Sequence, residues 1–552
     1  MKPTAVSLLL VTLLVQTAIG QSLHQPATQG PQSAGLLTTD LGGGNAAPVA
    51  PSNSDVLNKL DQLVEENAHL VEQNSHLAEQ NTHVVEQNRE LMEEIKALRQ
   101  TLTTQNAGSL EPAEETEPGA LLAAAATSAS RHSPETNNAA VPTPSVNPEE
   151  EERKKKWGTY TPDLGFNVGE TRFGDLNLKL FTYVRYLNQK ALDPTYTNYF
   201  GTTRNIQQRQ DIQVNKAIFY FLGWFMSPKF RYLGYVWSTN ASQGLGAQVV
   251  VAGNLQYTFD RHFTFGTGIN ALPGTRSLEG NFPYWLGVDD RAIADEFFRP
   301  SYTTGIWGRG EIAKGLTYNV MLGNNMSQLG VSAAQLDNGL DTVSSALVWM
   351  PTTGEFGGGR FGDYEEHQKV ATRIGFHFNR SNENKQSQPN TDSFDNVQIR
   401  LDDGTVIFTP NLFAPGTTVN DVTYHMIDAD AGIKYRGFSF DGEYYHRWLN
   451  GFSGPGTTGL PEITDNGFQL QTSVMIRPKL LQLYATGSSI FGKYGNPWDA
   501  RVGITYFPWR NQSVRWNAEY IQLYRSPVGA SSLPYAVGGT GPTFNSNLMV
   551  NF

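Results

Sequence analysis

The 552-residue chain contains no cysteine. This absence excludes a disulfide framework, a thiolate metal site and a cysteine nucleophile. Beyond its first twenty residues the sequence also lacks an uninterrupted apolar run of about 18 residues, the length that a membrane-spanning helix requires. Mean hydropathy is -0.38, although 11% of the residues are aromatic and 54 are glycine. The chain is therefore either soluble or crosses a membrane as alternating strands, which leave only a weak hydropathy signal.

The N-terminal segment, residues 1–20, has the pattern of a secretory signal peptide. A positive start precedes a short apolar run, and Ala18-Ile19-Gly20 is a small-x-small cleavage site before Gln21. We therefore expect an exported protein. Residues 21–54 are predicted to be a flexible leader and residues 104–157 a disordered linker, because both have low-complexity, polar compositions. Near its end the linker contains EEEERKKK, in which four glutamates neutralise the basic run that follows them. No nucleic-acid partner is therefore predicted.

Residues 55–103 repeat every seven positions, as in LVEENAH LVEQNSH LAEQNTH, which predicts an α-helical coiled coil. Two registers fit, and both place four successive asparagines in the core: Asn67, Asn74, Asn81 and Asn88. A buried asparagine fixes register and strand number at a cost in stability, so we predict a parallel bundle of identical chains. One register resembles the asparagine layers of trimeric autotransporter stalks, which favours a trimer over a dimer. The recurrent His69, His76 and His83 are predicted to face water.

From residue 158 to residue 552 the sequence alternates between polar and apolar residues in about sixteen segments, joined by turns that are alternately short and long. This pattern predicts an all-β transmembrane barrel of about sixteen antiparallel strands, preceded by the coiled coil. Lipid tolerates no open sheet edge, so the last strand, NSNLMVNF, is expected to pair with the first. One connection, residues 351–368, falls where a short turn is expected and is too long for one.

The final residue, Phe552, is an aromatic that follows alternating apolar positions. It resembles the recognition signal that outer-membrane barrels present to their assembly machinery.

Alternation also assigns the two faces of each predicted strand. In the first strand Leu176, Leu178 and Leu180 are expected to meet lipid, whereas the residues between them face the lumen. The residues predicted to line the pore are Lys179, Arg185, Arg231, Arg309, Arg373, Asp428, Asp430, Asp441, Glu443, Arg501 and Arg515. The four carboxylates lie across the barrel from the second and third strands. This predicts either an acidic wall that faces a mainly basic one or an ordinary polar lining.

The third long connection, residues 271–300, is unusually long and charged for a loop. The stretch from INALPGTRSLEG to DEFFRPSYTTGIWGRGEIAKGLTYNVMLGN resembles the phosphate-selective porin O and P family, and the resemblance covers residues 158–552. It implies an outer-membrane porin whose third loop folds into the lumen and forms the constriction. The residues implied at the constriction are Arg276, Glu279, Asp289, Asp290, Arg291, Asp295, Glu296 and Arg299.

The charges of this loop depart from the family pattern, in which a strongly basic constriction selects phosphate. Three arginines here are mixed with five carboxylates, and residues 158–552 hold 31 Lys and Arg against 32 Asp and Glu. We therefore expect a trimeric porin that passes small hydrophilic solutes or ions with weak selectivity. The coil ahead of a barrel is also similar to sucrose-specific porins, whose sugar path is aromatic. A phosphate-, anion- or sugar-selective porin is thus an alternative.

A second alternative is a tether, in which the coil spaces the outer membrane of a diderm bacterium from its cell wall and the barrel serves as the anchor. An enzyme is not predicted, because the sequence contains no nucleophile elbow, no HExxH and no phosphate loop. No cofactor or metal is expected. The expected partners are outer-membrane lipids, two further copies of the chain, the barrel assembly machinery, peptidoglycan in the periplasm and small hydrophilic solutes.

Overall fold

A computed structural model describes residues 158–239, 249–279, 282–326, 339–353, 356, 360–386, 399–529 and 533–552. The predicted signal peptide, leader, coiled coil and linker lie outside these residues, as do the four core asparagines. No helix in the described part of the chain is long and apolar enough to cross a membrane.

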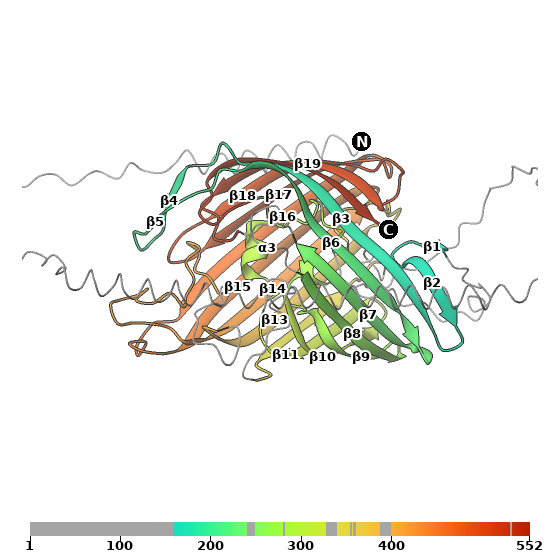
Figure 1. The fold of residues 1–552 in the computed structure, drawn as a ribbon, viewed down its shortest axis with the longest axis horizontal. Helices are drawn as coiled ribbons and strands as arrows, with labels where there is room; N and C mark the ends of the chain where they lie inside the picture. Colours follow the sequence, from blue (N-terminus) through green and yellow to red (C-terminus); the bar gives the residue numbers. More distant parts are fainter. Residues whose placement is uncertain are drawn as a thin grey trace, which may run out of the picture. The chain divides into compact units, whose positions relative to one another are not determined.

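Sixteen strands in the described residues form a closed antiparallel barrel (Figure 1). They are β3 (Gly174–Asn188), β6 (Gln210–Phe225), β7 (Ser227–Thr239), β8 (Val249–Asp260), β9 (Phe263–Ala271), β10 (Tyr302–Ala313), β11 (Leu316–Gly323), β12 (Thr342–Trp349), β13 (Ala371–Asn384), β14 (Asp421–Tyr435), β15 (Phe438–Ser453), β16 (Ile463–Arg477), β17 (Leu481–Phe491), β18 (Trp498–Tyr506), β19 (Val514–Tyr524) and β20 (Gly541–Asn551). Each strand pairs with its neighbour along the chain, and β20 pairs with β3. The prediction of about sixteen antiparallel strands is confirmed.

The closure of the barrel explains why the chain keeps its alternation to the last residue. Leu548 lies opposite Val184, and the backbone N–H of Phe552 donates to the carbonyl of Leu180 at 2.9 Å. Beyond the C-terminus the same edge of β3 is covered by β2 (Gly165–Thr171), which in turn pairs with the two-residue β1 (Tyr160–Thr161). Neither β1 nor β2 was predicted, because glycines and turn residues interrupt the alternation in TPDLGFNVGETRFGDL.

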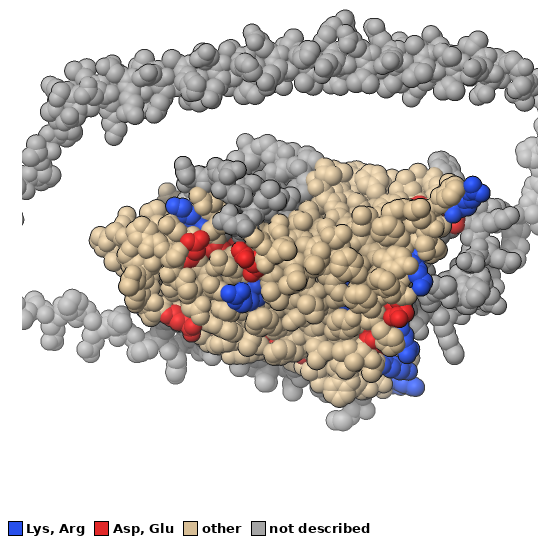
Figure 2. Space-filling model, turned by 90° about the horizontal axis from the view of Figure 1, so that it is seen from below, with Lys and Arg blue, Asp and Glu red and all other residues tan. Residues whose placement is uncertain are grey.

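The strands separate an apolar outer surface from a polar interior, as period-two alternation requires. Large apolar side chains such as Phe219, Ile374 and Phe376 are exposed on the outside, whereas Arg185 and Asn177 on the opposite face are buried. Figure 2 shows one side of the barrel, where charged residues are few and are separated by broad uncharged areas. An uncharged outer band is the surface that a hydrocarbon environment requires.

The connections at one end of the barrel are tight. Between β14 and β15, for example, Arg436 and Gly437 have φ angles of 48° and 82°, and positive φ at both central residues matches the twist of a two-residue hairpin. Two connections at this end are longer. Residues 507–513 join β18 to β19, and a much longer connection, here called the connector (residues 350–370), joins β12 to β13. The connections at the opposite end are long, and one contains the hairpin of β4 (Thr195–Thr197) and β5 (Thr203–Asn205).

Of the two predicted alternatives for the lining, the described residues do not show a mainly basic wall opposite the acidic strands. Only Lys216 and Arg231 are buried charges on β6 and β7. Gln213 of β6 and Gln256 of β8 are also buried. Much of the remaining buried face from β6 to β9 forms an apolar and aromatic cluster, composed of Ile218, Tyr220, Leu222, Leu233, Trp237, Ala252 and Ile269. Val288 from the long third connection packs into the same cluster, so this wall supports the loop by apolar contact.

Candidate functional site

The long third connection, here called the inner loop (residues 272–301), folds into the barrel between β9 and β10 (Figure 1). Nearly all of its described residues are buried. It contains a short 3-10 turn, η2 (Arg276–Leu278), and one helix, α3 (Ile293–Phe298), whose six residues are all buried. The helix packs against β16, β17 and β18, and Gly467 of β16 leaves the space that the Phe298 ring fills. The loop therefore lies inside the lumen.

Ion pairs hold the first part of the inner loop to the acidic wall. Arg276 lies 3.6 Å from the Asp441 carboxylate and 4.0 Å from that of Asp430, and its backbone N–H donates to Glu443 at 2.8 Å. Glu279 pairs with Arg373 of β13 at 2.5 Å. All these side chains are buried or nearly so, and a buried charge must be paired if it is to stay ionised. Arg276 of the loop is thus paired with two wall carboxylates, and Glu279 of the loop with a wall arginine.

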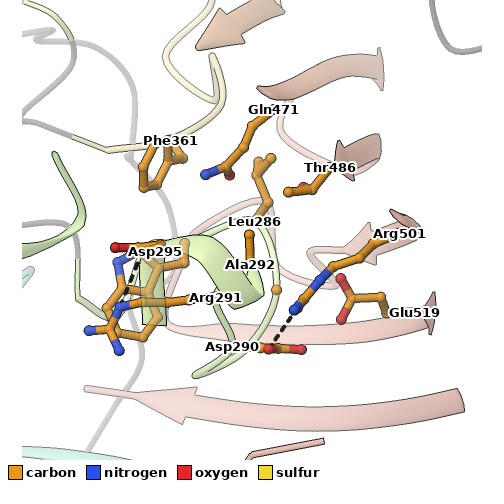
Figure 3. Close-up of a pocket in the computed structure, with 12 residues that line it drawn as sticks. Leu286, Asp290, Arg291, Ala292, Asp295, Phe361, Gln471, Thr486, Arg501 and Glu519 are labelled. Atoms are coloured by element: carbon orange, nitrogen blue, oxygen red, sulfur yellow. Dashed lines mark ion pairs between the residues drawn. The ribbon is translucent and has the colours of Figure 1, made fainter. Parts of the chain in front are cut away.

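The middle of the inner loop is tied to the opposite side of the barrel. The Lys216 ammonium lies 2.7 Å from the Asp289 carboxylate, which also accepts a hydrogen bond from Tyr183 Oη at 2.8 Å. Burial alone would raise the pKa of Asp289, but Lys216 outweighs it and holds the pKa below its ordinary value. Asp290 pairs with Arg501 of β18 at 2.7 Å, and the two side chains point toward one another in Figure 3.

Two wall arginines recognise the backbone of the same segment. Arg515 of β19 donates to the carbonyls of Pro283 and Trp285, each at 2.7 Å. Arg185 of β3 donates to the carbonyl of Val288 at 2.8 Å. A guanidinium with several planar donors suits such carbonyl groups better than an ammonium does. These bonds fix the path of the loop across the lumen.

The last part of the inner loop pairs its charges internally. Arg291 lies 3.6 Å from Asp295 and 3.2 Å from Glu296, and Arg299 lies 2.5 Å from Glu296. Burial raises the pKa of Asp295 to about 7 despite the opposing charge of Arg291, and Glu443 adds to the rise. All eight charged residues predicted for the constriction therefore have an ion-pair partner, so none is an isolated charge exposed to a passing ion.

The connector enters the lumen from the other end of the barrel and meets the inner loop. Lys434 of β14 donates to the carbonyls of Phe356 at 2.9 Å and Arg360 at 2.6 Å. The Arg276 guanidinium lies over the Phe361 ring, 4.6 Å from its centre. The unexpected length of this connection is explained by the distance that it must cover to reach the inner loop.

A cavity of about 20 Å³, room for about one water molecule, lies between the two segments (Figure 3). Leu286 and Asp290 of the inner loop, Phe361 of the connector, and Thr486 and Arg501 of the wall are among its lining residues. Its lining includes both charged and apolar groups. This cavity marks where the inner loop, the connector and the wall come together inside the barrel.

A further segment, here called the cap (residues 399–413), contributes buried apolar residues to the same cluster as α3. It contains one antiparallel bridge, between Arg400 and Val406. Asp402 accepts hydrogen bonds from the backbone N–H groups of Tyr494 at 3.1 Å and Gly495 at 2.7 Å. Burial, and then the nearby carboxylate of Asp465, raise the pKa of Asp402 to about 7.

The residues predicted to line the pore all lie on the inward side of the strand alternation. Most are buried: Arg185, Arg231, Arg373, Asp428, Asp430, Asp441, Glu443, Arg501 and Arg515. Lys179 lies over the Tyr220 ring, 5.6 Å from its centre, and Arg309 donates to Gln256 at 2.8 Å. Phe552, predicted to be the assembly signal, has its ring 5.7 Å from that of Phe166.

Sequence reasoning missed Lys216, Lys434 and Arg360, which hold the two inward segments in place. Lys216 escaped notice because a bulge between β3 and β6 shifts the register there, so that simple alternation assigns the wrong face. Arg360 forms an ion pair with Asp163 at 2.9 Å, a contact between two segments that the sequence left without structure. Lys434 was visible as an isolated lysine near the end of a strand, but its carbonyl partners belong to the unassigned connector.

No protein-family model matches the chain, and no curated protein sequence matches it. Among solved structures the barrel is similar to the outer-membrane expressed OmpT of Vibrio cholerae, with 10% sequence identity and a TM-score of 0.44, over 70% of this chain and 99% of that one. It is also similar to an anion-selective porin from Comamonas acidovorans, with 9% identity and a TM-score of 0.43, over 69% and 100% of the two chains. The barrel is similar as well to the outer membrane channel DcaP of Acinetobacter baumannii, with 8% sequence identity and a TM-score of 0.43, over 69% of this chain and 99% of that one. The fold assignment itself rests on the strand pairing described above.

Proposed function

We propose that this protein is an outer-membrane channel that lets small hydrophilic solutes or ions diffuse passively, with the inner loop as its constriction. The observation that carries the proposal is a closed barrel with an apolar exterior and a polar lumen, into which a loop folds and is tied to three parts of the wall. A closed barrel satisfies every strand edge within the membrane, and a polar lumen supplies a path that lipid does not.

Weak ion selectivity follows from the charge pairing. A selective pore presents a ring of like charges to the permeating ion. Here the arginines of the inner loop are paired with carboxylates and its carboxylates with cations, at distances from 2.5 to 4.0 Å. The net field at the constriction is small, so neither anions nor cations are strongly favoured. The same charge pairing disfavours phosphate selectivity.

The test is a solute-size limit measured by liposome swelling with neutral sugars of increasing size. Phe361→Ala and Leu286→Ala remove side chains that line the cavity between the inner loop and the connector without changing its charge. Each variant is expected to admit larger sugars than the native protein. Phe376→Ala is the matched control, because this phenylalanine is 51% exposed on the outside of β13. An unchanged size limit in both lumen variants would show that the constriction lies elsewhere.

The trimeric state and the tether both depend on the seven-residue repeat in residues 55–103. Four asparagine layers favour three parallel helices, so cross-linking of the full chain in native membranes is expected to give a trimer. A tether predicts that the full chain is retained on peptidoglycan and that deletion of residues 55–103 produces envelope defects while solute permeability stays the same. If deletion of the coil leaves both envelope and retention unchanged, the tether is excluded.

A further inference from the structure

A histidine and two aspartates meet on the lumen wall directly behind the start of the inner loop. His377 of β13 lies opposite Asp428 of β14 in the strand register, and Asp430 is two residues further along β14. The three side chains are almost fully buried. His377 Nε2 is 3.0 Å from Asp430 Oδ2 and 3.6 Å from Asp428 Oδ1.

The hydrogen bond of His377 Nδ1 determines whether Nε2 carries a proton or a lone pair. His377 Nδ1 lies 3.0 Å from the carbonyl oxygen of Pro273, which can only accept a hydrogen bond, so Nδ1 carries the proton. A neutral imidazole then points the lone pair of Nε2 at the two carboxylates, which are also acceptors when ionised. Such a contact requires either an additional proton or a metal ion between the three groups. Histidines that bind metal commonly donate their other N–H to a backbone carbonyl in this way.

Asp428 gives the independent observation. Its exposed fraction is 0%, and within the described part of the chain neither of its carboxylate oxygens has a hydrogen-bond partner. An isolated buried carboxylate is costly unless it is paired, protonated or bound to a metal. Glu443, the nearby carboxylate on β15, accepts hydrogen bonds from the Arg276 backbone and from Gln469, and it also interacts with the Asp428 carboxylate. Asp428 Oδ1 is directed into the cluster, 3.6 Å from His377 Nε2.

The spacing of the three groups suits a small tetrahedral ion. Two ligands with bonds of about 2.1 Å to the same tetrahedral ion are roughly 3.4 Å apart, and the two observed distances from Nε2 lie on either side of this value. Arg373 donates to Asp430 Oδ1 at 2.7 Å and more weakly to Oδ2 at 3.3 Å, while Oδ2 lies 3.0 Å from His377 Nε2. Gly375 has no Cβ, and any Cβ there would overlap the Asp430 carboxylate. Each of these features orients the ligand atoms toward one point.

We propose that His377, Asp428 and Asp430 form a binding site for a divalent transition-metal ion, with Zn²⁺ as the best fit. One imidazole and two carboxylates are a donor set that Zn²⁺ accepts, and three protein ligands leave a fourth position for water. Because His377 also holds the carbonyl of Pro273, the ion would stiffen the attachment of the inner loop to the wall. The site is a property of the folded barrel and stands whether or not the barrel conducts.

The test is a Zn²⁺ titration of the full chain in detergent, after removal of metal with a chelator and in competition with a chromophoric chelator. The native protein is expected to bind one more Zn²⁺ per chain than His377→Ala or Asp428→Asn. The histidines of the coil are common to all these proteins, so the difference isolates the site. His446→Ala is the matched control, because this histidine lies on the outward side of the neighbouring strand and contacts Asn466.

Two further measurements test whether the variants are folded and whether the metal site is tetrahedral. Heat-dependent gel mobility shows which variants contain a folded barrel, and Asp428→Asn preserves size if His377→Ala does not fold. Binding of Co²⁺ in place of Zn²⁺ is expected to give the visible absorption of a tetrahedral site in the native protein and to lose it in the two site variants. Equal Zn²⁺ binding by native protein and folded variants would overturn the proposal and place a proton on Nε2 instead.

Discussion

The ion pair between Lys216 and Asp289 gives the sharpest test of how the inner loop is held. The change is Asp289→Asn, which removes the negative charge but keeps the shape of the side chain. Asp289 has a φ of 49°, a conformation that asparagine also adopts readily, so the substitution adds no backbone strain. The hydrogen bond from Tyr183 can be retained by the amide oxygen. What is lost is the partner of a buried ammonium.

The free-energy cost of Asp289→Asn can be derived from the distance between Lys216 and Asp289 and from their burial. At 2.7 Å and an effective dielectric constant of about 20, the attraction is about 6 kcal/mol before desolvation. The two side chains are only 10% and 7% exposed, so solvent screens the pair little. Removing one partner of such a buried pair costs about 3–5 kcal/mol. At about 1.4 kcal/mol per tenfold change, local opening of the loop is expected to rise by roughly a hundredfold to a few thousandfold.

The assay is amide hydrogen exchange followed by mass spectrometry, on peptides that cover residues 283–299. Asp289→Asn should increase exchange in these peptides while the strands stay protected. Lys216→Met combined with Asp289→Asn should restore most of the protection, because no uncompensated charge remains. Asp211→Asn is the control, since its pair with Arg209 is at 3.2 Å and its side chain is 39% exposed. Protection within a few-fold of native in Asp289→Asn would refute the reasoning.

Three further predictions concern the cap, the loop backbone and the connector. The pKa of Asp402 is about 7 in the folded protein and 3.8 ordinarily, so protonation of this carboxyl stabilises the folded state. This stabilisation is full at acid pH and is lost as the pH rises through about 7. Exchange of cap amides, corrected for intrinsic rates, should therefore be faster at pH 8 than at pH 6, and Asp402→Asn should remove the difference. Arg515→Met leaves two buried carbonyls unpaired, at about 1–3 kcal/mol each, and should increase exchange in residues 283–287. Lys434→Met frees the carbonyls of Phe356 and Arg360 and should raise single-channel conductance; an unchanged conductance would show that the connector does not narrow the pore.

The fold was largely predictable because each strand carries its own local signal. Period-two alternation located all sixteen strands, and the pattern up to Phe552 predicted the closure with β3. The failures occur where the local signal is broken. The bulge beside Lys216 reversed the apparent face of that residue, and β2 was hidden by its turn residues.

The site was less predictable because its contacts join distant parts of the chain. The eight charged residues of the inner loop could be named from the sequence, but their partners could not. Glu279 and Arg373 are 94 residues apart, and only the closed barrel brings them together. The same holds for the connector, whose length was noted as anomalous and whose place inside the lumen depends on Lys434. The sequence showed that the charges of the loop are mixed, whereas only the structure shows which of them are paired.

The measurement that tests the central claim most directly is the reversal potential of the purified full chain in a planar bilayer under a salt gradient. The account predicts small, discrete conductance steps and a reversal potential close to zero, because the charges at the constriction are paired. Strong anion selectivity with block by phosphate would contradict it and would mean that Arg276, Arg291 and Arg299 act as free charges. No conductance from a folded barrel would contradict the channel itself and favour the tether.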